Sequence, residues 1–328
     1  MIKILTHHNF TDAKLHWDQI FEKSTNSTPF LTSWWNQTWH KYIDVNASID
    51  IIEIYENESL IGIAPLSIKD KIVKFIGDED LYDYRDFIVI KGKEIIFFEQ
   101  LAKHLSEITW DKIELNSIPS GSATLNYLPK FFEIKENNVS IYPENSTPTL
   151  VLAQNWNDYL SQLPKKNRHE LKRKIKRLES QTNYKTHICS NQNIHESCLN
   201  NFFNLHKLSS KEKSDFWNPE RERFFENISR ELIRNESLIL HSLILGNKCV
   251  AIAYILQSNE SFLLYNSGFN PEFSQYSVGL INTAFAIQHA ITASGKEFNF
   301  LKGKEKYKYH LGAQDINIFN ISISKSLP

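Results

Sequence analysis

A polar loop between an apolar strand and a long apolar helix is the most informative stretch of this chain. It reads Tyr265-Asn-Ser-Gly-Phe-Asn-Pro-Glu-Phe-Ser-Gln-Tyr-Ser-Val-Gly-Leu-Ile. The first turn of such a helix has unpaired backbone N–H groups and the positive end of the helix dipole, which together favour a phosphate group. We expect Ser277 to cap this helix and Gly279 to let a ligand approach the backbone. The alternative is an ordinary capped helix without a ligand.

A second stretch, Phe298-Asn-Phe-Leu-Lys-Gly-Lys-Glu-Lys-Tyr-Lys-Tyr-His, is predicted to be a strand that leads into a short charged helix. Acyl transfer from a thioester to an amine requires that the amine loses a proton and that the departing thiolate gains one. The oxyanion formed on the way must also be stabilised. Glu305 could serve as the base and Tyr307 as the acid. Alternatively, both are surface residues at a solvated helix end.

The predicted helix around Arg168 is strongly basic. Leu171, Ile175 and Leu178 form one apolar stripe, and its other faces carry Lys165, Lys166, Arg168, Lys172, Arg173, Lys174, Lys176 and Arg177. Such a helix attracts a polyanion, whether pyrophosphate, nucleic acid or anionic lipid. We expect Arg168 and Lys172 to line a cleft between two domains and to bind an anionic acceptor or cofactor. The alternative is a solvated helix face.

Several kinds of site have no sequence signature here. The chain has no GxxxxGK[ST], GxGxxG, GxSxG or HExxH motif. Its histidines are scattered without ligand spacing, so no metal is expected. The net charge of −1 predicts neither nucleic-acid nor membrane binding by the chain as a whole.

The length of the chain predicts two domains, because 328 residues suit two domains of roughly 150 residues each. The three cysteines are expected to be buried thiols in a reducing compartment, with a disulfide framework excluded. The start of the chain does not resemble a signal peptide, and no apolar run approaches the ~18–20 residues of a membrane span. These features predict a cytoplasmic protein, with a peripheral place at the inner face of the membrane as the alternative.

Hydrophobic periodicity predicts strands and helices in both halves of the chain. Predicted helices cover residues 13–21, 30–42, 96–106, 156–162, 168–179, 194–208, 220–234 and 278–293, with a short helix after residue 300. Predicted strands cover 2–5, 51–55, 60–68, 72–76, 112–115, 184–189, 238–245, 250–257, 261–267, 297–300 and 316–323. Residues 131–145 are expected to be irregular. The tryptophan stripe in residues 30–42 is expected to be core.

The two halves repeat one order of elements, which suggests a duplicated domain. The segment Ile61-Gly-Ile-Ala-Pro-Leu in the first half is similar to Val250-Ala-Ile-Ala-Tyr-Ile in the second. The fold class is therefore predicted to be α/β, with mixed, largely antiparallel sheets flanked by helices. The domains are expected to span residues 1–152 and 153–328.

Several motifs in order resemble the GNAT-like acetyltransferases of cellulose and exopolysaccharide biosynthesis. In the first half they are Thr28-Pro-Phe-Leu-Thr-Ser-Trp-Trp, Ile61-Gly-Ile-Ala-Pro-Leu, Phe75-Ile-Gly and Asp83-Tyr-Arg-Asp-Phe. In the second half they are Leu163-Pro-Lys-Lys-Asn-Arg-His-Glu-Leu-Lys-Arg-Lys, Phe216-Trp-Asn-Pro-Glu, Phe224-Phe, Tyr265-Asn-Ser-Gly-Phe, Tyr276-Ser-Val-Gly and Leu301-Lys-Gly-Lys-Glu-Lys-Tyr-Lys. That family is similar in fold to the Fem-type peptidyltransferases.

The resemblance implies two tandem GNAT-like domains, the first degenerate and on the acceptor side, the second catalytic. It places acetyl-CoA or another acyl-CoA, as co-substrate, against the strand ending near Ser267 and the helix opening at Ser277. The implied cofactor-binding residues are Ser267, Gln275, Tyr276, Ser277, Val278 and Gly279. The implied catalytic group is Glu305, Tyr307 and Lys308. The expected substrate-binding residues are Arg168, Lys172, Trp217, Tyr265, Asp83 and Tyr84.

The sequence departs from the family at two points. The segment Gln275-Tyr-Ser-Val-Gly-Leu is one residue longer than the usual GNAT pyrophosphate loop and lacks its second small residue. Asn299 stands where the family often has Asp, so a carboxylate base at that position is excluded.

The leading functional hypothesis is N- or O-acylation of a small-molecule or glycan acceptor, such as a sugar or polysaccharide intermediate, by acyl-CoA. The runner-up is a Fem-type peptidyltransferase that uses aminoacyl-tRNA, for which the basic helix would bind RNA. Fem-type enzymes often carry a coiled coil, and no long heptad run exists here. A third hypothesis is a non-catalytic protein that binds a glycan or partner. Nucleic acid is expected as a partner only under the runner-up.

Overall fold

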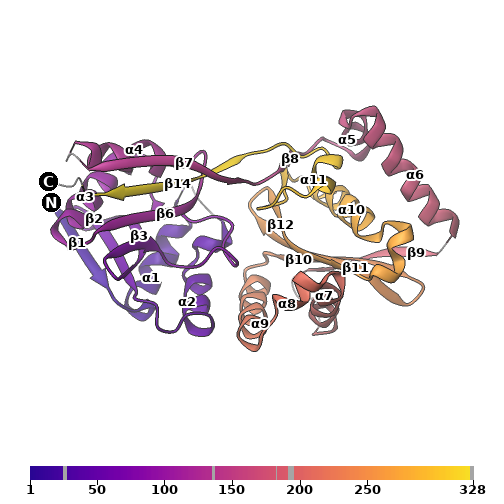
Figure 1. Cartoon of the computed structure of the whole chain (residues 1–328), viewed down its shortest axis with the longest axis horizontal. Coiled ribbons are helices and arrows are strands. Elements are labelled where there is room, and N and C mark those ends of the chain that lie inside the picture. The colour runs from indigo at the N-terminus through magenta and orange to yellow at the C-terminus, as the bar shows by residue number, and fades with distance from the viewer. Residues whose placement is uncertain (25–27, 135–136, 182, 191–195, 326–328) are drawn as a thin grey trace. The chain divides into compact units, whose positions relative to one another are not determined.

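The computed structural model describes residues 1–24, 28–134, 137–181, 183–190 and 196–325, which form two compact units (Figure 1). The first unit contains Met1–Asn145 and Asn317–Pro328, and the second contains Ser146–Ile316. The division expected from the sequence lies between residues 152 and 153, with the last strand in the second domain. In the structure the division falls after residue 145, and the last strand belongs to the first unit.

One mixed sheet forms the centre of the first unit, in the order β1-β2-β3-β4-β6-β14-β7, with β5 paired to β3. Its strands are β1 (Ile2–His7), β2 (Asp50–Glu56), β3 (Ser59–Lys69), β4 (Ile72–Phe75), β5 (Ile88–Val89), β6 (Lys112–Pro119), β7 (Asn138–Ser146) and β14 (Asn317–Ser324). Its helices are α1 (Phe10–Phe21), η1 (Pro29–Leu31), α2 (Ser33–Tyr42), α3 (Glu94–Glu107) and α4 (Ala123–Glu133). The expectation of an irregular segment at 131–145 was wrong, because α4 ends and β7 lies within it.

Aromatic and aliphatic side chains on one face of each helix form the core of this unit. On α3, Phe97, Phe98 and Leu101 are at most 1% exposed and pack against the sheet. On α2, Trp35 and Trp39 are buried, as the predicted core stripe requires. Such burial removes apolar surface from water, which is the main favourable term in folding.

The second unit has a six-stranded mixed sheet in the order β8-β13-β12-β11-β10-β9. Its strands are β8 (Thr149–Val151), β9 (Tyr184–Ser190), β10 (Leu238–Leu245), β11 (Lys248–Ser258), β12 (Ser261–Phe269) and β13 (Glu297–Asn299). Its helices are α5 (Trp156–Gln162), α6 (Lys165–Gln181), α7 (Glu196–Ser209), α8 (Lys211–Asp215), α9 (Pro219–Arg234), η3 (Pro271–Tyr276), α10 (Val278–Thr292) and α11 (Lys306–His310). Helices α7, α8 and α9 lie on one side of this sheet, and α6 and α10 lie on the other (Figure 1).

The same order of elements occurs in both units. In each, three antiparallel strands are followed by a helix and by a strand parallel to the third: β2-β3-β4, α3 and β6 in the first, β10-β11-β12, α10 and β13 in the second. The two similar sequence segments lie on equivalent strands, β3 and β11. The predicted fold class, α/β with mixed sheets flanked by helices, is therefore confirmed.

The last strand, β14, joins the first sheet beside β6 instead of completing the second. Ile318, Ile321 and Ile323 of β14 are fully buried. The alternation of Ile321 and Ile323 with polar residues predicts a strand, but alternation does not specify which sheet the strand joins, because any sheet with an apolar face would bury them equally well.

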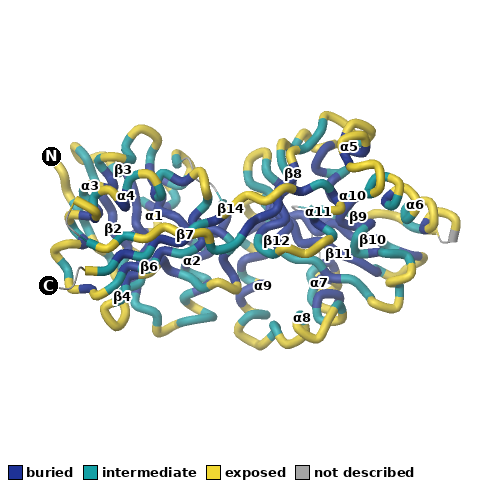
Figure 2. Tube along the Cα trace, turned by 45° about the horizontal axis from the view of Figure 1, so that its top comes forward, coloured by how far each residue is buried: buried dark blue, intermediate teal, exposed yellow. Residues whose placement is uncertain are grey.

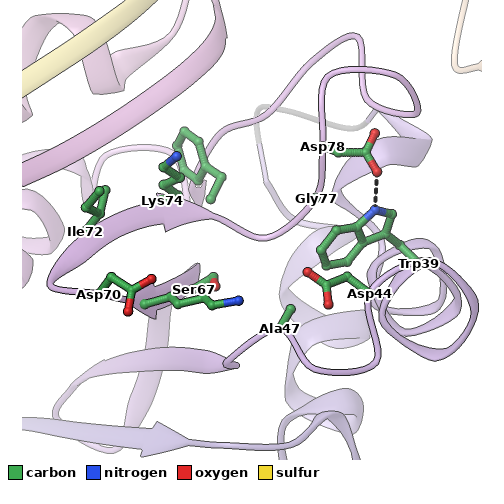
Figure 3. A pocket seen from close by; sticks show the side chains of 11 residues that line it. Trp39, Asp44, Ala47, Ser67, Asp70, Ile72, Lys74, Gly77 and Asp78 are labelled. Carbon is green, nitrogen blue, oxygen red and sulfur yellow. Dashed lines mark hydrogen bonds between the residues drawn. The ribbon is translucent and has the colours of Figure 1, made fainter.

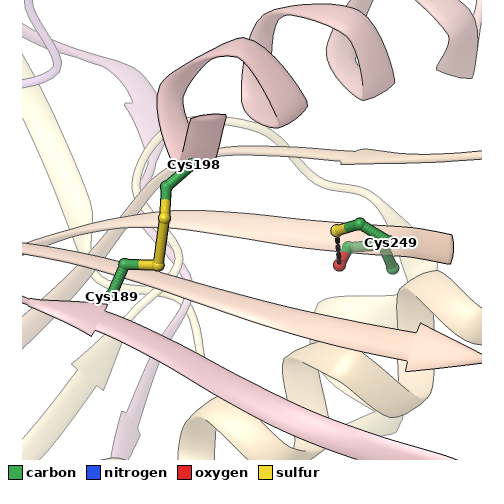
Figure 4. The surroundings of a disulfide bond; sticks show 4 residues. Cys189, Cys198 and Cys249 are labelled. Carbon is green, nitrogen blue, oxygen red and sulfur yellow. Dashed lines mark hydrogen bonds between the residues drawn. A yellow bond between two sulfur atoms is a disulfide. The ribbon is translucent and has the colours of Figure 1, made fainter. Parts of the chain in front are cut away.

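Cys189 of β9 and Cys198 of α7 form a disulfide (Figure 4). The sequence analysis expected every cysteine to be a free buried thiol, so this expectation was wrong for two of the three. Cys249 remains a thiol and donates to the Ala251 carbonyl. The pairing was missed because the two residues are nine positions apart, and nothing local indicates that β9 and α7 lie against each other.

Buried residues follow the inner strands of both sheets, and exposed residues follow the outer helix faces, the turns and edge strands such as β7 (Figure 2). The burial pattern of α6 shows that its apolar stripe faces inward, since Leu171 is 3% exposed and Leu178 fully buried. Within the described part of the chain, no helix combines the length and the apolar character needed to cross a membrane.

Gly268 of β12 lets α7 pack directly against the second sheet, and this contact yields a stability prediction. A Cβ atom at Gly268 would lie 2.4 Å from the His206 backbone nitrogen and 2.5 Å from the Leu205 carbonyl carbon. Backbone atoms cannot move aside cheaply, so Gly268→Ala should destabilise the protein by about 1–3 kcal/mol or more. A lower urea midpoint, measured by circular dichroism, checks this.

Gly121→Ala is the control, because a Cβ there would meet no heavy atom within 4 Å. Equal urea midpoints for Gly268→Ala and Gly121→Ala would contradict the close approach of α7 to β12.

Candidate active site

An extra residue in β12 turns two consecutive side chains toward the same helices. Tyr254 of β11 pairs with Asn266, whereas its neighbour Ile255 pairs with Leu264, so Tyr265 is one residue more than the register allows. A bulge of this kind bends a strand and re-aims its side chains. The Tyr265 ring stacks on Phe225 of α9 with 5.7 Å between centroids, and Asn266 bonds to α7 on the same side of the sheet.

Beyond the first three residues of β12, the edge on the β13 side is open. The parallel pairing joins Ser261–Leu263 of β12 to Glu297–Asn299 of β13. The chain then leaves the sheet at Phe300, while β12 continues to Phe269. In the described ranges no strand pairs with this edge beyond Leu263. Backbone groups at an open strand edge can pair with an extended ligand.

His206 of α7 holds Asn266 in place through a chain of hydrogen bonds. The Trp217 indole N–H donates to His206 Nδ1 at 2.9 Å, and His206 Nε2 lies 2.8 Å from Asn266 Oδ1. An indole nitrogen can only donate, so His206 Nδ1 carries no proton and Nε2–H donates to Asn266. The Asn266 oxygen is thereby occupied, and its NH₂ group remains a donor for a ligand.

The imidazole of His206 is neutral at physiological pH. Burial lowers its pKa to about 4, and the positive charge of Lys213 acts in the same direction. Because both ring nitrogens already have partners, His206 orients other groups and does not act as a base. Trp217, expected to bind substrate, lies in this chain of hydrogen bonds and packs among Phe202, Phe203 and Phe225.

Lys213 of α8 is a charged group near Asn266 and Ser267 that was not expected from the sequence. Its ammonium donates to the Ser267 carbonyl at 2.5 Å. Burial lowers its pKa, whereas the carboxylates of Glu305 and Glu212 oppose that shift and Lys308 adds to it. Ser267, an expected cofactor contact, therefore has its carbonyl engaged. The sequence places Lys213 three residues before the Phe216-Trp motif. That position could have indicated a role at the site, but nothing distinguishes it from an ordinary surface lysine.

Lys308 holds the turn that follows β13. Its side chain is buried, and its ammonium donates to the carbonyls of Leu301, Lys302 and Gly303 at 3.3, 2.8 and 3.1 Å. It also forms an ion pair with Glu305 at 2.9 Å. With all its donors engaged, Lys308 positions the turn, which differs from the catalytic role implied by the resemblance.

Asn299 stabilises the same turn. Its side-chain oxygen accepts from the backbone N–H of Leu301 at 2.8 Å, and Leu301 has a left-handed backbone with φ of 56°. Asn is well suited to this role because its short side chain hydrogen-bonds the backbone two residues ahead.

Glu305 and Tyr307 lie next to this turn, at the start of α11. Glu305 precedes the helix and is exposed, with 57% of its side-chain surface accessible. Burial raises the pKa of the Tyr307 hydroxyl, and the nearby Glu305 charge raises it further, so the hydroxyl stays protonated at neutral pH. In the described part of the chain its hydroxyl makes no hydrogen bond. Tyr307 can therefore donate a proton to a bound group.

The N-terminus of α10 differs from the expected capped helix. Ser277 has a left-handed backbone with φ of 56°, and its side chain makes no capping hydrogen bond, so this expectation was wrong. Its hydroxyl instead accepts from the Lys174 ammonium of α6 at 2.7 Å. The first internal bond runs from Ile281 N to Ser277 O, which leaves the preceding N–H groups free of helix partners.

The remaining expected cofactor residues lie around this terminus in different environments. Val278 is fully buried, and Gln275 and Tyr276 end the preceding η3 turn. Gly279 lies close to Phe269, because a Cβ at Gly279 would be 3.2 Å from that ring. Its small size therefore serves packing against Phe269.

The basic helix α6 brings its cations toward α10 at one point. Lys174 contacts Ser277 and also pairs with Glu170 at 3.6 Å. Arg168 donates to the Ser161 carbonyl at 3.0 Å, and Lys172 is exposed. Lys174 was not a candidate, although its i+3 spacing from Leu171 indicated that it lies beside the apolar stripe.

Asp83 and Tyr84 belong to the first unit, not to the unit that carries the other candidates. Tyr84 is 7% exposed and packs against Phe30. The following Arg85 is buried, and its backbone N–H bonds to the Ser117 carbonyl of β6. This segment therefore lies beside β6 within the first unit.

A pocket of about 310 Å³ also lies in the first unit (Figure 3). It is lined by Trp39, Asp44, Ala47, Ser67, Lys69, Asp70, Ile72, Lys74, Phe75, Gly77 and Asp78. Trp39 donates to Asp78 at 2.5 Å across its wall. None of these residues is a sequence-predicted site residue.

The low pKa of His206 yields a pH prediction. The unfolded chain binds a proton at this residue near pH 6.5, whereas the folded chain binds it only near pH 4. The stability that His206 contributes is therefore present above pH 6.5 and is lost as the pH falls from 6.5 toward 4. In a ¹⁵N NMR titration the ring should stay neutral from pH 8 to 5.5 in the folded protein and titrate in urea. A folded midpoint near 6.5 would contradict the hydrogen-bonded arrangement.

Comparison with known proteins gives one domain match and several similar folds. Residues 165–309 match the family model described as an acetyltransferase (GNAT) domain. A comparison with curated protein sequences finds no match. Among solved structures, the chain is similar to FemX, with a TM-score of 0.67, 12% identity, and 97% of this chain and 96% of that one covered.

Two further structures share the fold. The C-terminal domain of a putative lysylphosphatidylglycerol synthetase from Agrobacterium fabrum has a TM-score of 0.61 at 8% identity, covering 96% of this chain and 92% of that one. A GNAT-family acetyltransferase from Colwellia psychrerythraea has a TM-score of 0.50 at 13% identity, covering 99% and 100%. These likenesses concern the fold, and the match to the acetyltransferase (GNAT) domain model lies within the second unit.

Proposed function

We propose that the chain transfers an acyl group, most simply acetyl, from acyl-CoA to an amine or hydroxyl of an acceptor, within the second unit. The observation that carries this proposal is the N-terminus of α10. Free N–H groups, the left-handed Ser277 and the Lys174 ammonium converge there, and no acidic residue lies in the first turn. Backbone N–H groups beside a left-handed residue form a concave anion site, which fits a pyrophosphate.

The first unit offers a contrast at the equivalent helix. The first turn of α3 contains Glu94, whose negative charge already occupies the favourable end of the helix dipole. The preceding Lys93 is paired with Glu56 at 2.7 Å. These differences support a cofactor site in the second unit and a degenerate first unit on the acceptor side.

The open edge of β12 and the residues around it provide the chemistry of transfer. The pantetheine arm of CoA, with its two amides, can pair with this edge and bring the thioester to the bulge at Tyr265. Tyr307 then protonates the departing thiolate, and Glu305 accepts the proton of the acceptor, directly or through water. The free NH₂ of Asn266 and the ammonium of Lys213 orient the acceptor on the α7 side.

For the acceptor, we propose a sugar or polysaccharide intermediate, in keeping with the resemblance of the sequence motifs, and a cytoplasmic site of action. The alternative is aminoacyl-tRNA-dependent transfer. Its support is the likeness in fold to FemX. Calorimetric titration of the purified chain with acetyl-CoA separates the two. Absence of acetyl-CoA binding would overturn the acyl-CoA proposal and favour the alternative.

Lys174→Met should weaken CoA binding. The substitution removes the charge beside the α10 N-terminus but keeps an apolar stem of similar length. A hydrogen bond to a charged group contributes about 1.5–3 kcal/mol, so the Kd should rise roughly tenfold or more. The difference from the parent should shrink at high salt, because salt screens the charge.

Lys176→Met on the same helix is the matched control, since Lys176 is exposed. Calorimetry at two salt concentrations compares both variants with the parent. If Lys174→Met and Lys176→Met bind CoA equally well, the pyrophosphate does not lie at α10.

Tyr307→Phe should lower turnover while leaving CoA affinity unchanged. The change removes only the hydroxyl. A thiol is a fairly good leaving group, with a pKa near ~8.5, so the loss in kcat should lie toward the low end of ~10²–10⁴-fold. The measurement is a pH–rate profile with a competent acceptor.

Tyr309→Phe tests whether any tyrosine of α11 would have the same effect. Tyr309 bonds to Asp315 at 2.7 Å and is not expected to reach the thioester. It should keep the parent rate. A Tyr307→Phe variant that turns over like the parent at every pH would remove Tyr307 from the acid role.

A further inference from the structure

Three potential metal ligands meet between β9 and α7. The ligating atoms of His187, Cys189 and Cys198 all lie within 4.8 Å of one another. Side chains alternate along a strand, so His187 and Cys189 point to the same face of β9. Cys198 reaches that face from the first turn of α7, as Figure 4 shows for the two sulfur atoms.

This set of donors suits a thiophilic divalent ion. Zn²⁺ binds thiolate at ~2.3 Å and imidazole at ~2.0–2.1 Å in tetrahedral geometry, which places neighbouring donors roughly 3.6–3.8 Å apart. Small side-chain rotations within the observed cluster reach those separations once both cysteines are thiols. The Cα atoms of Cys189 and Cys198 are 6.9 Å apart, slightly beyond the separation usual for a disulfide, roughly 4.4–6.8 Å. A backbone this widely spaced has room for an ion between the sulfurs.

The surroundings of the three side chains also fit a metal site. Cys189 and Cys198 are 1% and 8% exposed, so both sulfurs come from the protein interior. His187 is exposed, and in the ranges that the structure describes its ring makes no hydrogen bond or ion pair. The imidazole therefore approaches from the solvent side, and a water molecule can take the fourth position.

We propose that the reduced chain binds one Zn²⁺ ion through His187, Cys189 and Cys198. Binding releases the two thiol protons and forms two Zn–S bonds and one Zn–N bond, with no change in oxidation state. The disulfide and the zinc complex exclude each other, because each uses both sulfurs. This site is separate from the acyl-transfer residues and does not depend on the proposed function.

A bound ion would fasten the edge strand β9 to α7. Helix α7 also carries His206, which holds Asn266, and it packs directly on Gly268 of β12. Zinc should therefore raise the melting temperature of the reduced protein. This proposal departs from the sequence-based expectation of no metal, which rested on the spacing of the histidines and did not combine them with cysteines.

The experiment uses the full chain, reduced with a phosphine and handled without oxygen. Zn²⁺ is titrated against a chromophoric chelator, and bound metal is counted by mass spectrometry after gel filtration. The parent should bind one equivalent. Cys189→Ser and Cys198→Ser should lose the ion, and His187→Ala should bind it at least tenfold more weakly. Cys249→Ser, which keeps all three ligands, should behave like the parent.

Cobalt and thiol reactivity provide independent readouts. Co²⁺ bound at this site should give a thiolate-to-cobalt absorption band that Cys249→Ser keeps and Cys189→Ser loses. Zinc should also protect two of the three thiols of the reduced parent from a disulfide reagent. His187→Ala alters an exposed residue and should fold normally, which circular dichroism checks. Absence of Zn²⁺ from the reduced parent, or equal binding by the parent and His187→Ala, would overturn the proposal.

Discussion

The extra residue in β12 is the constraint on which the candidate site depends. Because Tyr265 does not fit the pairing with β11, it and Asn266 both turn toward the helices on one side of the sheet. The extra residue lies where β12 has already lost its pairing with β13, so the open strand edge and the two side chains lie along the same part of the strand. A regular strand would have pointed one of them to the opposite face.

Two lysines, the buried Lys308 and the half-buried Lys213, keep positive charge close to this edge. Lys308 and Lys213 both donate to backbone carbonyls, Lys308 to three of them and Lys213 to Ser267. A buried ammonium is costly unless its donors are satisfied, and carbonyl oxygens satisfy them without adding negative charge. Glu305 is the carboxylate shared by both, through an ion pair with Lys308 and through its charge on Lys213. The turn after β13 and helix α8 are therefore coupled electrostatically.

The two units share an order of strands and helices but differ at the positions where chemistry would occur. At the helix that follows the third strand, the first unit has Glu94 and the second has a left-handed Ser277 with Lys174 beside it. Each unit therefore has an equivalent helix N-terminus. The charge of the residues around it determines how favourable that terminus is for an anion. Likeness of fold to FemX and to a GNAT-family acetyltransferase covers 97% and 99% of this chain, but a shared fold does not determine a function, which depends on local residues.

The sequence by itself determined most strands and helices, the similar segments on β3 and β11, the inward stripe of α6 and the location of Glu305 and Tyr307. The strands, the helices and the stripe depend on residues two to four positions apart, which periodicity records directly. Tertiary structure alone decided that β14 joins the first sheet, that Ser277 binds Lys174 in place of capping α10, that Lys308 holds a turn and that Cys189 meets Cys198. It also assembled Trp217, His206 and Asn266. His206 and Asn266 are 60 positions apart and Lys174 and Ser277 are 103 apart, so only packing of separate elements brings them together.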